Sequence, residues 1–118
     1  MDYSQLSDFE INKRVFKAIV GAKPLGYPHN ADGRSVGNES NGNYRWYDYC
    51  NNPEDAWPII TGNKISIMFD STDTRYEGEY HEWCDAISSC QKFGIQHQSN
   101  PLRAAMIVFL MMQDANNA

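Results

Sequence analysis

The fold is decided by residues 100–112, which read Asn100-Pro101-Leu102-Arg103-Ala104-Ala105-Met106-Ile107-Val108-Phe109-Leu110-Met111-Met112. Asn100 is a favourable N-cap, because its side chain can accept hydrogen bonds from the free N–H groups of a first helical turn. Pro101 suits the first helical position, where its missing N–H costs nothing. The nine residues after Arg103 are all apolar. A helix that is apolar on every side belongs inside a fold, and a membrane span would need about 20 such residues. We therefore predict a buried core helix and no membrane segment.

Length and charge limit the class of protein. At 118 residues the chain is long enough for a single domain, residues 1–118, with its own core. Its net charge of −5 argues against binding to duplex nucleic acid, because such proteins usually carry a basic face. The N-terminus lacks the features of a signal peptide. Three cysteines, an odd number without framework spacing, fit reduced thiols in a cytoplasm.

A second helix is predicted to begin near the N-terminus. Ser7 and Glu10 have the spacing of a capping box, and Leu6 and Ile11 can form a hydrophobic staple across it. Gly21 is a suitable C-terminal stop. Apolar residues then recur on one face at helical spacing, and these are Ile11, Val15, Ala18, Ile19 and Ala22.

Residues 25–43 differ in composition from the rest of the chain. They contain four Gly, four Asn and two Ser, with almost nothing to bury. Such a stretch cannot offset its ordering entropy by burial. We predict a mobile loop, of a length that occurs either in lids over functional sites or in segments without a role.

The middle of the chain is rich in aromatic residues. Residues 44–49 contain four of them, and their alternation predicts a strand with Tyr44 and Trp46 on one face. Asn52 then caps a short helical turn that Pro53 opens. We expect this turn to break at Pro58, because proline removes a helical hydrogen bond.

A hairpin is predicted after this turn. Residues 64–69 alternate as a strand that places Ile65, Ile67 and Phe69 on one face. Residues 79–87 are the expected antiparallel partner, and residues 88–99 a polar connection to the last helix. The prediction is a small α+β domain, with an antiparallel sheet of about three strands packed against the N-terminal helix and the buried C-terminal helix.

Three stretches of this sequence resemble the NinX family of lambdoid phages and their prophages. They are MDYSQLSDFEINKR at residues 1–14, CNNPEDAWPIITGNKISI at residues 50–67 and NPLRAAMIVFLMM at residues 100–112. The resemblance implies a phage accessory protein that is made in the cytoplasm of an infected bacterium. The family is of unknown function, so the resemblance implies no catalytic residues.

The sharpest site hypothesis is an anion site at the start of the C-terminal helix. First-turn N–H groups at a helix start favour phosphate or carboxylate, and Arg103 could clamp the same anion with its planar fork. Asn100 and Arg103 would hold the phosphate of a nucleotide-like ligand, and nearby aromatic residues would provide a stacking surface for its base. The residues of this predicted surface are Tyr44, Arg45, Trp46, Tyr47 and Trp57. The structural alternative is that Arg103 pairs with a carboxylate such as Asp55 or Glu54, and that the aromatic residues belong to the core and sheet.

Two further clusters of side chains were weighed. Five Cys and His residues could supply ligands for zinc. They are Cys50, His81, Cys84, Cys90 and His97. Their spacing lacks the Cys-x2-Cys pair that is typical of structural zinc sites. Six carboxylates crowd the predicted hairpin, where they are interpreted as a solvated face or a surface for a basic host protein. They are Asp70, Asp73, Glu77, Glu79, Glu82 and Asp85.

No motif of an enzyme is present. The chain has no P-loop, no G-x-G-x-x-G and no G-x-S-x-G elbow. We therefore expect a non-enzymatic binding protein without catalytic residues, bound metal or cofactor. Its partner is predicted to be a small anionic or nucleotide ligand, with a role in counter-defence, or alternatively a host protein inhibited through the acidic hairpin. A small metal-dependent hydrolase is a third possibility.

Overall fold

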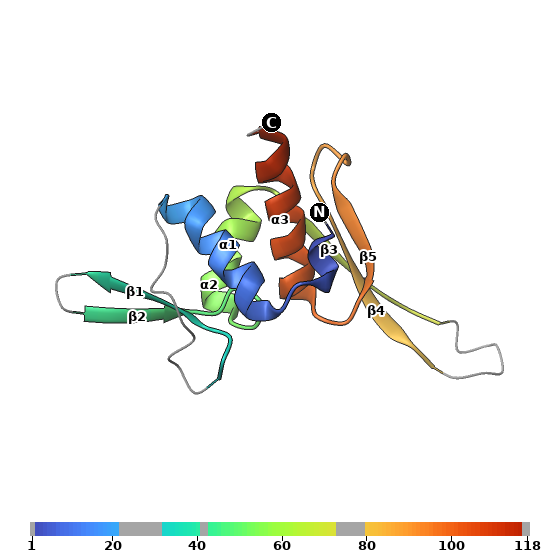
Figure 1. Ribbon diagram of the computed structural model, residues 1–118. Helices are drawn as coiled ribbons and strands as arrows, with labels where there is room; N and C mark the ends of the chain where they lie inside the picture. Colours follow the sequence, from blue (N-terminus) through green and yellow to red (C-terminus); the bar gives the residue numbers. More distant parts are fainter. Residues whose placement is uncertain (1, 22–31, 41–42, 73–79, 117–118) are drawn as a thin grey trace.

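The computed structural model describes residues 2–21, 32–40, 43–72 and 80–116 of the chain. The α-helices lie between a two-stranded and a three-stranded antiparallel sheet (Figure 1), which confirms the α+β prediction. In chain order the elements are η1 (Tyr3–Gln5), α1 (Asp8–Val20), β1 (Val36–Ser40), β2 (Asn43–Tyr47), α2 (Pro53–Gly62), β3 (Ser66–Ser71), β4 (Glu82–Ile87), β5 (Gly94–Gln98) and α3 (Pro101–Asn116).

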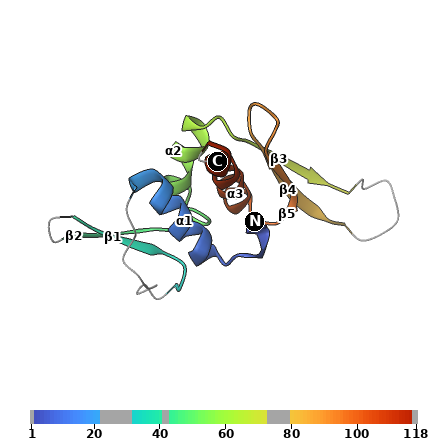
Figure 2. The ribbon, with the colours of Figure 1, turned by 45° about the horizontal axis from the view of Figure 1, so that its top comes forward.

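Helix α3 is the centre of the fold, as its sequence predicts. The Asn100 side chain accepts hydrogen bonds from the backbone N–H groups of Leu102, at 3.0 Å, and Arg103, at 3.2 Å. All seven residues from Ala104 to Leu110 are buried. Helices α1 and α2 pack on one side of α3 and the three-stranded sheet on the other (Figure 2). No helix in the described part of the chain is long and apolar enough to cross a membrane.

Helix α1 begins and ends where the sequence predicts. The Ser7 hydroxyl accepts a hydrogen bond from the N–H of Glu10 at 3.2 Å, and Gly21 ends the helix with a left-handed φ of 77°. The buried face is shorter than expected, because the second half of α1 extends beyond the core and leaves Ile19 48% exposed. Ala18 is also exposed, and Ala22 lies outside the described residues.

The aromatic strand does not join the main sheet. It forms β2 and pairs with β1, which lies within the stretch predicted to be a loop at residues 25–43. That prediction is wrong for residues 36–40, since Val36 is fully buried and the Trp46 ring lies against Gly37. A Cβ at position 37 would come within 3.0 Å of that ring, so this glycine serves close packing. Residues 25–31 and 41–42 lie outside the described part.

Two other expectations are corrected. Residues 88–99 are more than a connection, because β5 pairs there with β4. Helix α2 continues through Pro58 to Gly62. The proline removes one hydrogen bond, to the carbonyl of Glu54, and the exposure of both residues lets water replace it.

The predicted hairpin is confirmed as β3 and β4, paired antiparallel with Ser66 opposite Ile87 and Ser71 opposite Glu82. Strand β3 is an edge strand, since the sheet order is β3-β4-β5. Its neighbour β4 carries the buried residues Cys84 and Ala86 under α3. The α3-facing side of the sheet therefore continues the core, and β3 lies at its border.

The N-cap of α3 yields a testable stability difference. We expect Asn100→Ala to lower the free energy of unfolding by about 1–2 kcal/mol, because two first-turn N–H groups lose their acceptor. Urea denaturation measures this change. Asn116→Ala, at the exposed opposite end of the same helix, is the control and should change the value by less than about 0.5 kcal/mol. Equal effects of the two substitutions would contradict the capping role.

Candidate functional site

Arg103 is engaged by the N-terminal segment of the chain. Its Nη1 atom lies 2.7 Å from the Asp8 carboxylate, and its Nη2 atom donates to the backbone carbonyls of Ser4 and Leu6. The structural alternative of an ion pair is therefore the arrangement found, with Asp8 in place of the suggested Asp55 or Glu54. These three contacts fasten the N-terminal segment and the first residue of α1 to the start of α3.

The backbone donors at the start of α3 also have partners within the protein. The N–H groups of Leu102 and Arg103 are bound by the Asn100 side chain, and the N–H of Ala104 donates to the Asn100 carbonyl at 3.0 Å. Pro101 has no N–H. The donors that the sequence suggested for an anion are thus used to hold the helix start in place.

The residues of the predicted stacking surface lie in different places. Arg45 is 3.8 Å from Asp55 and covers the Tyr47 ring, which stacks on Tyr49 with ring centroids 5.6 Å apart. Trp46 packs on Gly37, as described above, in the separate two-stranded sheet. The backbone of Tyr44 belongs to β2, and its side chain lies outside the described residues.

A buried polar network around Asp48 was not predicted. The Asp48 carboxylate accepts from the Asn12 side chain at 2.9 Å and from Arg34 Nε at 3.0 Å, and its backbone N–H donates to Asp55 at 2.9 Å. The Asn12 side chain also accepts from the N–H of Cys50 at 3.1 Å. Sequence patterns missed this network because its members are far apart in the chain. Each contact is internal, so the network joins α1, the β2–α2 turn and the segment before β1.

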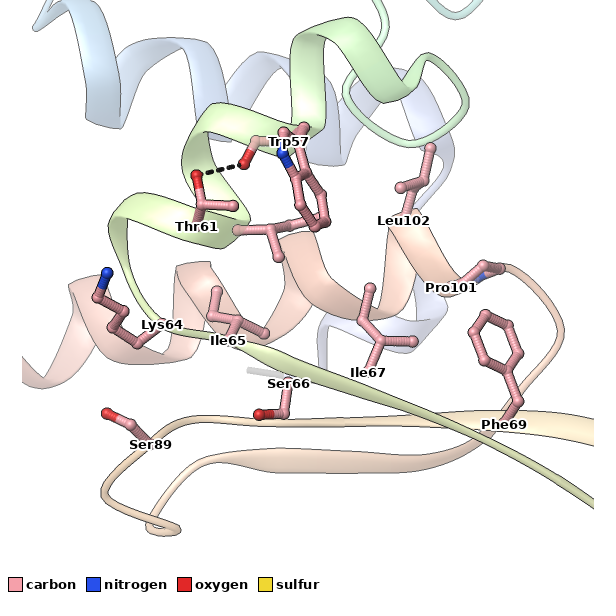
Figure 3. Close-up of a pocket in the computed structure, with 11 residues that line it drawn as sticks. Trp57, Thr61, Lys64, Ile65, Ser66, Ile67, Phe69, Ser89, Pro101 and Leu102 are labelled. Atoms are coloured by element: carbon pink, nitrogen blue, oxygen red, sulfur yellow. Dashed lines mark hydrogen bonds between the residues drawn. The ribbon is translucent and has the colours of Figure 1, made fainter.

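One concave feature of the surface is an open groove with several exposed lining residues. Figure 3 shows it between α2, β3 and the start of α3, and its volume is about 750 Å³. Trp57, the remaining predicted site residue, lies on the α2 wall and is 61% exposed, whereas Phe69 on β3 is 76% exposed. The lining residues are Trp57, Ile60, Thr61, Lys64, Ile65, Ser66, Ile67, Phe69, Ser89, Pro101 and Leu102.

The lining determines what this groove can do chemically. Ile65, just before β3, and Ile67 and Phe69 within it point to the same side of the strand, toward α2 and the start of α3, as the predicted alternation requires (Figure 3). Among the described residues of the lining Lys64 is the only charged one, and the Thr61 hydroxyl donates to the Trp57 carbonyl at 3.0 Å. A groove of this size and polarity suits apolar side chains of a ligand, and those described residues include no nucleophile paired with a base. The sequence identified the apolar row but contained no sign of how far it would be covered, since Ile65 is buried whereas Phe69 is 76% exposed.

The cysteines differ in their surroundings. Cys50 and Cys84 are buried and Cys90 is exposed. Burial raises the pKa of the Cys50 and Cys84 thiols, whereas a hydrogen bond from Ser88 lowers the pKa of Cys90. Within the described residues no group of three or more His, Cys, Asp and Glu side chains could hold a metal ion.

The acidic hairpin can be placed only in part. Asp73, Glu77 and Glu79 lie outside the described residues. Asp85 accepts a hydrogen bond from the backbone N–H of His97 at 2.9 Å, which stabilises the pairing of β4 and β5. One of the six carboxylates therefore has a structural role.

Comparison with known proteins identifies one family. The family model described as "Bacteriophage P22, NinX" matches residues 2–113 of this chain. No curated protein and no solved structure matches it. The match extends beyond the three stretches of sequence resemblance and includes all five strands.

The engagement of Arg103 leads to a prediction for stability. We expect Arg103→Ala to lower the free energy of unfolding by about 2 kcal/mol, because Asp8 loses a charged partner and two carbonyls lose their donor. Lys13→Ala, which removes an exposed ion pair with Glu10, is the control and should cost less than about 0.5 kcal/mol in urea denaturation. A thermal shift by phosphate or nucleotide that Arg103→Lys abolishes would contradict this purely structural role.

The thiols should react in a fixed order. In the native protein near pH 8 we expect a thiol reagent to modify Cys90 rapidly, because it is exposed and its lowered pKa increases the thiolate fraction. Cys50 and Cys84 should react only after unfolding. Mass spectrometry after timed labelling measures the order, and rapid native labelling of Cys50 would contradict the packing described here.

Proposed function

This chain belongs to the bacteriophage P22 NinX family, and we propose that it is a non-enzymatic phage accessory protein that binds a polypeptide segment in the groove between α2, β3 and α3. The observation that carries this proposal is the exposure of Trp57 and Phe69 beside an apolar groove of about 750 Å³. The proposed place of action is the cytoplasm of the infected host.

The character of the groove favours a polypeptide over a small anion. Exposed apolar patches on a single chain commonly mark interaction sites, and aromatic residues supply much of the energy of such interfaces. A nucleotide would need donors for its phosphates, but the groove carries one cation, Lys64. The donors of Arg103 and of the α3 start are already bound to Asp8, Ser4, Leu6 and Asn100. Sequestration of a nucleotide in counter-defence therefore has less support from this geometry.

Inhibition of a host protein is still one form that this binding could take. We place its contact surface in the groove, whereas the sequence suggested the acidic hairpin. Residues 73–79 of the acidic hairpin lie outside the described part of the chain, and Asp85 in β4 is bound to the backbone N–H of His97. The groove instead combines exposed side chains with the outer edge of β3, which pairs with no other described strand. Both features are used in the recognition of peptide segments.

A photo-crosslinking experiment tests the proposed function. A photoreactive amino acid at Thr61, which lines the groove and is exposed, should give a discrete adduct when the protein is irradiated in bacterial cells. The same group at Lys17, an exposed position of α1 outside the groove lining, should give none. We expect Phe69→Ser to reduce the Thr61 adduct about tenfold, because it removes an aromatic anchor.

Two results of the crosslinking experiment would contradict binding in the groove. Equal labelling from Thr61 and Lys17 would indicate random collision and would overturn the proposal. An adduct from Thr61 that Phe69→Ser leaves unchanged would show that the apolar groove does not hold the partner. Circular dichroism of each variant verifies that the fold is retained.

A further inference from the structure

Lys64 has an unusual backbone conformation just after helix α2. Its φ of 55° is left-handed, a region that glycine adopts at much lower cost than a residue with a Cβ. The N–H of Lys64 donates to the Thr61 carbonyl at 3.4 Å, and the N–H of Ile65 donates to the Ile60 carbonyl at 3.0 Å. These two bonds end the helix in a Schellman motif, in which position 64 is the one that glycine usually occupies. The lysine is therefore held there at a cost in backbone energy.

The Lys64 side chain lies at one end of the groove. Figure 3 shows Lys64 and Ser89 at this end and Phe69 at the other, with Ile65 and Ile67 between them. Lys64 is exposed, and in the described part of the chain its ammonium group has no hydrogen bond or ion pair. The groove thus combines an apolar floor with an uncompensated positive charge at one end.

The sign of this charge is opposite to that of the chain as a whole. The protein has a net charge of −5, yet the described residues of the groove lining include one cation, Lys64, and no carboxylate. Backbone positions that are held in costly conformations occur preferentially at sites that clamp a ligand. A charge at an interface selects partners of the opposite sign, because like charges repel each other there. Charge complementarity therefore indicates a negative group in the partner.

We propose that the groove binds a polypeptide segment whose apolar side chains contact Trp57 and Phe69 and whose acidic side chain pairs with Lys64, an inference that rests on the proposed function of the groove. The carboxylate is that of an Asp or Glu side chain. A terminal carboxylate is commonly held by backbone N–H groups, but the N–H groups of Lys64 and Ile65 are bound to carbonyls of α2. Lys64 thereby sets specificity, whereas the aromatic residues supply most of the affinity.

Selection from a random peptide library tests the charge preference. We expect the wild-type protein to enrich apolar peptides that carry Asp or Glu, and Lys64→Glu to enrich apolar peptides that carry Lys or Arg. Lys17→Glu makes the same charge change at an exposed position of α1 outside the groove lining. This matched control should keep the wild-type preference. Equal preferences of the wild type and Lys64→Glu would overturn the proposal.

A peptide from this selection permits a direct measurement of the proposed ion pair. Replacing its acidic residue by the corresponding amide should weaken binding to the wild type about threefold, the effect of one exposed ion pair. The same replacement should leave binding to Lys64→Gln unchanged, because that variant has no charge to lose a partner. Fluorescence polarisation measures the four dissociation constants. An equal loss of affinity for both proteins would overturn the contact with Lys64.

Lys64→Gly separates a role in binding from a role in folding. Glycine adopts the left-handed conformation at lower cost, so we expect this variant to unfold at a higher urea concentration than the wild type. It should also lose the preference for acidic peptides. A lower midpoint of unfolding together with an unchanged peptide preference would assign Lys64 to the fold and overturn the proposal.

The two proposals can fail separately. Selected peptides that lose affinity for Phe69→Ser but show no preference for acidic residues overturn the role of Lys64 and leave the proposed function standing. Peptides that bind Phe69→Ser as tightly as the wild type, or the absence of any selected peptide, overturn both. Light scattering coupled to gel filtration tests another occupant of the groove. A wild-type dimer that Phe69→Ser dissociates would put a second copy of this chain in the groove and overturn the acidic segment.

Discussion

The rest of the structure depends on the need to bury helix α3 on every side. Seven consecutive residues, from Ala104 to Leu110, are buried, so no face of this helix can be left to solvent. One sheet of about three strands can cover only one side. Helices α1 and α2 cover the other, as Figure 2 shows, and the aromatic strand β2 then pairs with β1 beyond these helices, away from the main sheet.

The polar residues at the start of α3 complete this burial. Asn100 binds the first-turn N–H groups, and Arg103 binds Asp8 and two carbonyls of the N-terminal segment. These are the residue types that anion sites use, because a helix start and a guanidinium attract any negative group, whether it comes from a ligand or from the same chain. Here the chain itself supplies the carboxylate. The anionic partner of Arg103 in this structure is therefore internal.

The candidate site lies where the burial of α3 is incomplete. Strand β3 extends past the start of α3, so Phe69 lies at the border of the apolar face and is 76% exposed, whereas Ile67 still packs against the core. Trp57 lies on α2, on the other wall of the groove, and is 61% exposed. The groove and the exposed end of β3 both lie at the border of the sheet beyond the core. Membership of the NinX family is consistent with binding there but names no partner.

The sequence by itself determined the local elements, their caps and the apolar face of β3. Ser7, Gly21, Asn100 and the alternation at Ile65, Ile67 and Phe69 act through neighbours in the chain, so local patterns are sufficient to predict them. Tertiary structure decided which elements pair and which polar groups meet. Strand β1 is stabilised by packing between Gly37 and Trp46, and Arg103 is bound by a residue 95 positions away. Such contacts depend on the three-dimensional path of the chain, which no local spacing records.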